Sequence, residues 1–254
     1  MNARSPSALF GYAVALGDDA LVLAQRCAEW ITNAPQLEED VALANIGLDL
    51  LGQARMLLTY AGEVEGAGRG EDDLAYLRGE REFRNLHIVE QPNEDFAVSM
   101  ARLLFFSSYQ LALYEGLIRS ADPTLAAVAG KAVKEVAYHR DHATSWVLRL
   151  GDGTPDSHGR MQAGVERMWP YVQEMFDGAW IDPALVAEGV AVDPRSLRAG
   201  WEEYVGGVLA EATLEPPRTR WHARGGREGI HSEALGYLLA ELQHLPRSHP
   251  GATW

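Results

Sequence analysis

The residues of this chain that could do chemistry are carboxylates and one histidine on apolar helical stretches. Residues 134–139 read Lys-Glu-Val-Ala-Tyr-His, which places Glu135 about one helical turn before His139. A di-iron centre in a helical bundle needs a Glu from each of two helices and a Glu-x-x-His pair from each of two others. The Glu135–His139 spacing is one residue too long, and Gln53 stands on an earlier stretch where a second His is required. The sequence therefore indicates a di-iron framework whose own ligands are incomplete.

A wider set of polar residues defines two alternatives for the interior. The first is a metal centre, because non-haem iron accepts carboxylate and imidazole ligands. Its candidate ligands are Asp18 or Asp19, Asp49, Glu115, Glu135 and His139. The second is a buried polar network, in which residues such as Asn45, Asp49 and Gln53 satisfy one another, since an isolated buried charge costs several kcal/mol. Only one His is available for two irons, so we favour the network and predict no catalytic, cofactor-binding or metal-binding residue in this chain.

Two strict Glu-x-x-His matches occur near the C-terminus, at Glu228–His231 and at Glu241–His244. They are thirteen residues apart, so on one straight helix they point about 220° away from each other. They cannot share a metal site, and we interpret both as chance matches.

The elements that must position these residues are long helices. Apolar residues at three-and-four spacing predict helices over about Ser7–Asn33, Gln36–Glu63, 93–122 and Pro123–Leu150. Asn93 is expected to cap the third helix. On the second helix the residues expected to face inward are Val41, Ala44, Leu48, Leu51, Leu58 and Ala61. Each helix has about 27 residues, or ~40 Å at ~1.5 Å per residue.

Four such helices with one long connector, around residues 64–92, are typical of a ferritin-like four-helix bundle. Further helices are expected at about 157–176, 194–214 and 230–245. The sequence therefore predicts an all-α fold and a single ferritin-like domain over residues 1–254. Its core bundle would span about 7–150, and its additional C-terminal helices about 157–245.

Composition restricts the partners and the compartment. The chain has 254 residues and a net charge of −14, which argues against nucleic acid and against an anionic membrane surface. Cys27 is the only cysteine. Residues 1–7 lack the layout of a signal peptide, and we expect no apolar run to approach the ~20 residues of a membrane span. We predict a cytoplasmic protein.

One basic segment stands out in this acidic chain. Residues 216–227 contain Arg218, Arg220, Trp221, Arg224 and Arg227 and no acidic residue. Arg and Trp are enriched at binding hot spots, which favours an interface anchor. A loop packed on the acidic surface of the protein itself and a site for an anionic ligand are the alternatives.

Taken together, these residues resemble a known family over nearly the whole chain. The chain resembles the C-type subunits of the phenylacetyl-CoA ring epoxidase, a bacterial multicomponent oxygenase also called phenylacetate-CoA oxygenase. The resemblance rests on residues 17–23 (GDDALVL), 38–45 (EEDVALAN), 48–55 (LDLLGQAR), 134–139 (KEVAYH), 148–154 (LRLGDGT), 231–233 (HSE), 238–243 (LLAELQ) and 249–254 (HPGATW).

The resemblance implies a non-catalytic structural subunit that pairs with a similar, catalytic A subunit in aerobic phenylacetate catabolism. The A subunit would hold the di-iron centre and bind the CoA thioester, while other small subunits and a reductase complete the complex. Matching the catalytic pattern to this chain places Leu50, Gln53, Val136 and His139 at ligand positions, and three of these cannot act as ordinary iron ligands. The alternative is an autonomous di-iron oxidase or oxygenase with its own metal site.

Overall fold

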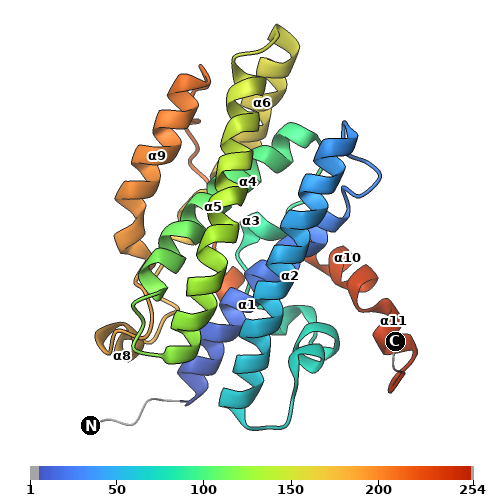
Figure 1. Ribbon diagram of the computed structural model, residues 1–254, viewed down its shortest axis with the longest axis vertical. Coiled ribbons are helices and arrows are strands. Elements are labelled where there is room, and N and C mark those ends of the chain that lie inside the picture. The colour runs from blue at the N-terminus through green and yellow to red at the C-terminus, as the bar shows by residue number, and fades with distance from the viewer. Residues whose placement is uncertain (1–5, 253–254) are drawn as a thin grey trace. The chain divides into compact units, whose positions relative to one another are not determined.

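The computed structural model describes residues 6–252, and no β-strand occurs among them, which confirms the all-α prediction. The four longest helices are α1 (Pro6–Ala28), α2 (Leu37–Glu65), α4 (Phe96–Leu117) and α5 (Pro123–Gly151) (Figure 1). Residues 1–5 of the N-terminal stretch and residues 253–254 of the C-terminal motif lie outside the described residues.

Shorter helices and single turns make up the connections and the C-terminal part. The α-helices are α3 (His87–Glu90), α6 (Pro155–Met168), α7 (Val172–Met175), α8 (Pro183–Ala187), α9 (Arg198–Glu211), α10 (Glu233–Leu242) and α11 (His244–Ser248). The turns are the π-helical η1 (Asp73–Leu77) and the 3₁₀ turns η2 (Glu80–Glu82), η3 (Trp169–Tyr171), η4 (Pro194–Leu197) and η5 (Gly226–Glu228).

Some predicted helix ends were wrong, for local reasons. The first helix ends at Ala28 rather than near Asn33, and Thr32 then adopts a left-handed backbone with φ 72°. Asn93 does not cap α4, because Asp95 does so by accepting a hydrogen bond from the Ala97 backbone N–H at 2.7 Å. The helix predicted over 157–176 is divided into α6, η3 and α7.

The chain forms two compact units, and each contains one hairpin of long helices. Unit 1 holds the described residues up to Pro92, Trp180–Ala187 and the described residues from Arg224 onward. Unit 2 holds Asn93–Ala179 and Glu188–Ala223. The prediction of a single domain over residues 1–254 stays a prediction.

Unit 1 is built on the α1–α2 hairpin, whose helices lie side by side (Figure 1). The two helices approach closely at glycines. A Cβ atom on Gly47 would lie 3.3 Å from the Cβ of Cys27, and one on Gly17 would lie 2.8 Å from Leu58 Cδ2. Small residues at these positions allow the helix backbones to pack tightly against each other.

Unit 2 is built on the α4–α5 hairpin, with α6 and α9 packed against it. α4 is buried on nearly all sides, as expected for a helix that is apolar all round. An aromatic cluster joins α4 to the later segments. The Trp201 ring of α9 lies 5.7 Å from that of Phe105 and 5.5 Å from that of Phe176, and Trp201 Nε1 donates to the Phe105 carbonyl at 2.8 Å.

The inward face predicted for α2 was partly wrong. Leu58 and Ala61 are buried as predicted, but Val41, Leu48 and Leu51 are 54%, 65% and 38% exposed. The helix carries two apolar stripes, and the buried one instead includes Leu43, Ile46, Leu50, Ala54 and Leu57. Spacing alone could not choose between the stripes, because both repeat at three and four residues.

Three helices are long and apolar enough to cross a membrane by length and composition alone: Ser7–Ala28, Leu37–Glu65 and Phe96–Leu117. The expectation that no stretch would reach this threshold was therefore wrong. The most apolar windows of the first and third are 78% and 89% buried inside the protein, but that of the second is only 44% buried.

A glycine substitution tests the packing of α6 on α4. A Cβ atom on Gly164 would lie 2.8 Å from the Ala97 carbonyl oxygen and 2.9 Å from its carbonyl carbon, both backbone atoms. We expect Gly164→Ala to lower the free energy of unfolding by about 1–3 kcal/mol through overpacking, measured by urea denaturation.

The matched control is Gly130→Ala on α5, where a Cβ would meet nothing within 4 Å. It should raise the free energy of unfolding by about 0.5–1 kcal/mol, because Ala favours the helix more than Gly does. Equal effects of the two substitutions would contradict the proposed packing.

Candidate functional site

The candidate site is a group of buried carboxylates in unit 1, which begins with Asp18 and Asp19 on α1. These side chains are 0% and 2% exposed on a helix that is otherwise buried and apolar. Neighbouring residues on a helix point about 100° apart, so each carboxylate needs its own partner. A buried carboxylate without a cation or hydrogen-bond donors is strongly destabilising.

Asp18 is paired with Arg78, from the segment that follows η1. Arg78 Nη1 donates to Asp18 Oδ2 at 2.9 Å, and Arg78 Nη2 donates to the other oxygen. The Arg84 backbone N–H donates to Asp18 Oδ2 at 2.8 Å. The guanidinium of Arg78 also lies 4.2 Å from the centre of the Phe83 ring. Both oxygens of Asp18 are thus engaged by donors from one segment.

Asp19 is paired with Arg227, from η5 in the C-terminal segment. Arg227 Nη2 donates to Oδ2 at 2.6 Å and Nη1 donates to Oδ1 at 3.0 Å. The Leu86 backbone N–H donates to Oδ1 at 2.8 Å. Burial raises the pKa of Asp19 from its ordinary value of 3.8 to about 6, although the charge and hydrogen bonds of Arg227 act in the opposite direction.

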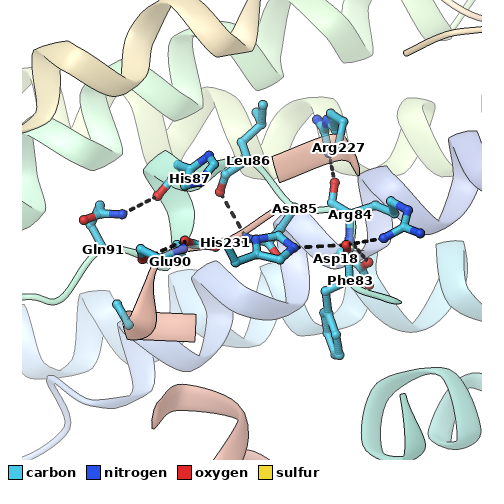
Figure 2. Close-up of polar contacts among 12 residues, drawn as sticks. Asp18, Phe83, Arg84, Asn85, Leu86, His87, Glu90, Gln91, Arg227 and His231 are labelled. Atoms are coloured by element: carbon cyan, nitrogen blue, oxygen red, sulfur yellow. Dashed lines mark hydrogen bonds and ion pairs between the residues drawn. The ribbon is translucent and has the colours of Figure 1, made fainter. Parts of the chain in front are cut away.

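Glu90, the last residue of α3, is the third buried carboxylate and is fully enclosed. Oε2 accepts hydrogen bonds from Asn85 Nδ2 and is 2.8 Å from His231 Nδ1. Oε1 accepts from the backbone N–H and the hydroxyl of Ser232, both at 2.7 Å. Figure 2 shows Glu90 and His231 beside the residues that surround Asp18.

Both ring nitrogens of His231 have partners in unit 1. The second ring nitrogen of His231, Nε2, faces the Phe83 carbonyl oxygen at 3.0 Å, and a carbonyl can only accept. Nε2 therefore donates to this carbonyl, while Nδ1 faces the Glu90 carboxylate at 2.8 Å. This pair connects the C-terminal segment to α3 and to residues 83–85.

The metal alternative can be tested against the positions of its candidate ligands. Glu115 and Asn45 are exposed, and Asp49 and Glu135 are partly buried. His139 and Gln53 are buried, on α5 and α2 respectively. Within residues 6–252, no group of three or more His, Cys, Asp or Glu side chains is arranged to hold a metal ion.

The donor set does not fit a di-iron centre. Leu50 and Val136 stand at positions where the catalytic A-type pattern has metal ligands. Both are apolar core residues, with 1% and 0% exposure. Asp18 and Asp19 already use both of their oxygens on arginine and backbone donors. What this arrangement can do is neutralise and hold together segments that are distant in sequence.

The two Glu-x-x-His matches do not form metal-binding pairs. Glu228 is exposed, whereas the side chain of His231 is buried against Glu90. Glu241 and His244 are both exposed. His231 nevertheless has a structural role through its contacts with Glu90 and the Phe83 carbonyl. The interpretation of Glu228–His231 as a chance match did not predict this role.

The basic segment is divided between two environments. Arg227 is buried on Asp19, while Arg218, Arg220 and Arg224 are exposed and form no ion pair within the described part of the chain. Trp221 is 60% exposed, and its ring lies 6.0 Å from that of Tyr171, edge to face. These positions do not favour the alternative in which the arginines pack on the acidic surface of the protein.

Sequence reasoning missed Arg78, Glu90 and the pairing role of Arg227. One signal was present, because two adjacent Asp residues on an apolar helix require cations from elsewhere. Their source could not be read from the sequence: Arg78 is 60 residues from Asp18, and Arg227 is 208 residues from Asp19.

Comparison with known proteins gives two findings. The model of a family described as "Phenylacetic acid catabolic protein" matches residues 1–254. The chain is also 50% identical over 246 residues to the C-type subunit of 1,2-phenylacetyl-CoA epoxidase from Escherichia coli (strain K12), and this match covers 97% of this chain and 99% of that protein. The family is ferritin-like, which confirms the predicted fold class.

The pKa of Asp19 leads to a pH-dependent prediction. Because this pKa is higher in the folded protein than in the unfolded chain, its stabilising contribution is complete below about pH 3.8 and is lost as the pH rises through about 6. Asp19→Asn cannot titrate. When the pH falls from 7 to 5, the free energy of unfolding of the parent should therefore rise by about 1 kcal/mol relative to that of the variant.

Denaturant titrations of both proteins at the two pH values measure this difference. A fall of the parent relative to Asp19→Asn on acidification would mean that Arg227 outweighs burial and holds the pKa below its ordinary value.

Proposed function

This chain belongs to the phenylacetic acid catabolic protein family, and we propose that it is a structural, non-catalytic subunit of a phenylacetyl-CoA ring-1,2-epoxidase. In this role it pairs with a catalytic di-iron A subunit, in a complex with other small subunits and a reductase, and takes part in aerobic phenylacetate catabolism. Its place of action is the cytoplasm. The E. coli relative is named as a subunit, which supports a role within an assembly.

The observation that carries the proposal is the pairing of the α1 carboxylates with arginine. In a di-iron protein, inward carboxylates provide negative charge for the metal ions. Here Arg78 and Arg227 provide the positive charge, and each engages both oxygens of its aspartate. An iron ion would have to displace a guanidinium and leave it buried without its carboxylate, which costs several kcal/mol.

The structural role follows from rigidity. The three carboxylates hold α1, residues 78–90 and the C-terminal segment in one arrangement through hydrogen bonds of 2.6–3.0 Å. A subunit with a fixed surface can hold a catalytic partner in the geometry that its own metal ligands require, because a preorganised site depends on a well-supported surrounding shell.

Metal analysis and reconstitution test the proposal together. The purified chain and the A-type subunit of the same organism are each assayed for iron and for oxygen-dependent conversion of phenylacetyl-CoA, alone and mixed. We expect a stable complex whose activity requires both chains. Its iron content should not change when this chain is treated with a chelator before mixing, because the iron is held by the A-type subunit. About two irons per molecule of this chain alone would favour the autonomous di-iron oxygenase and contradict the proposal.

A further inference from the structure

The second apolar stripe of α2 is exposed and regular. Leu37, Val41, Leu48 and Leu51 are 74%, 54%, 65% and 38% exposed, and Ala44 lies between them. Their spacing is four, three, four and three residues, the repeat of a coiled-coil seam. The stripe runs for about 21 Å along the helix, at ~1.5 Å per residue. We call these five residues the α2 seam.

The α2 seam borders an apolar groove within unit 1. The groove has a volume of about 350 Å³. Ala44, Leu48 and Leu51 form one side of it, α1 residues such as Leu21 and Ala24 form the floor, and Tyr76 and Leu242 are further lining residues. Ile31, which is 46% exposed, extends the apolar surface. Contiguous exposed apolar surface of this kind marks an interaction site.

The spacing of the α2 seam fits a helix as its occupant. A four-three repeat keeps one narrow stripe in register with a second helix, whose side chains insert into the holes between the seam residues. An extended peptide or a small ligand would not require this repeat over four turns.

The surrounding charges select a different polypeptide over a second copy of this chain. Glu38 and Asp40 flank the first turn of the α2 seam. Glu71 and Asp72 lie near Tyr76, whose pKa is raised by burial and, to a smaller extent, by these two charges. Arg55, which follows Leu51 by one helical turn, is bonded to Glu71 at 2.8 Å. Two copies with a charge of −14 each would repel one another, and these acidic groups also disfavour an anionic membrane.

We propose that the α2 seam and its groove bind a helix of the A-type epoxidase subunit, and that this helix carries an apolar stripe flanked by Lys or Arg. The identity of the partner rests on the proposed function, whereas the location and the helical nature of the contact rest on the seam itself. Burial of the exposed leucines in such a contact removes apolar surface from water, which is the main favourable contribution to association.

Leu48→Glu tests the proposal, with Leu77→Glu as the matched control. Leu77 is 58% exposed in the same unit, but it does not line this groove. The affinity of each purified variant for the A-type subunit is measured by calorimetry, and circular dichroism checks that helix content is retained. Leu48→Glu should weaken binding at least about tenfold, since it buries an unpaired carboxylate among apolar side chains, and Leu77→Glu should change it less than about twofold.

The other outcomes overturn specific parts of the proposal. Equal binding by Leu48→Glu and the parent overturns the seam as the docking surface and leaves the proposed function standing. No complex between the parent and the A-type subunit overturns the proposed function and the named occupant. A dimer of the parent that Leu48→Glu dissociates identifies a second copy as the occupant. Binding of the parent, but not of Leu48→Glu, to phosphatidylglycerol vesicles identifies a membrane instead. Each of these last two results overturns the proposal.

Discussion

The structure of unit 1 depends on the neutralisation of two adjacent carboxylates inside a helix that is otherwise apolar. Asp18 and Asp19 lie on α1, and their charges cannot be buried without cations and donors. Arg78 reaches Asp18 from the segment that follows α2, and Arg227 reaches Asp19 from the C-terminal segment. The chain must therefore bring residues 78–90 and its C-terminal segment onto α1, which explains why unit 1 includes parts of the chain that are distant in sequence.

Further contacts strengthen the same connection. Gln243 Nε2 donates to the carbonyls of Ala75 and Arg78 at 3.1 and 3.0 Å, and Arg247 donates to those of Tyr76 and Arg78. The C-terminal helices thus satisfy backbone acceptors around η1, where the irregular chain leaves carbonyls without helical partners. In the same unit, α2 keeps one of its two apolar stripes buried and leaves the other exposed.

The sequence predicted the helices well and their environment less well. Periodicity located α2 and α5 to within a few residues, because long amphipathic helices give a strong signal. It could not decide which stripe of α2 is buried, so Leu48 was placed inside although it is 65% exposed. The incomplete ligand pattern was indicated by Gln53 and by the Glu135–His139 spacing, and the family resemblance added Leu50 and Val136. The pairing of Asp19 with Arg227 was not, because it joins residues that only the tertiary fold brings together.

A double-mutant cycle on Asp19 and Arg227 tests the central claim most directly. The free energies of unfolding of the parent, Asp19→Asn, Arg227→Met and the double variant are measured at pH 8, where Asp19 is ionised. Arg227→Met should lose about 3–5 kcal/mol, because it leaves the ionised Asp19 buried without its cation. Asp19→Asn should lose less, because it also removes the cost of burying that charge. The double variant should lose at least about 1.5 kcal/mol less than the sum of the two single losses. Additive losses would show that the carboxylate and the guanidinium do not depend on each other, and would contradict the account.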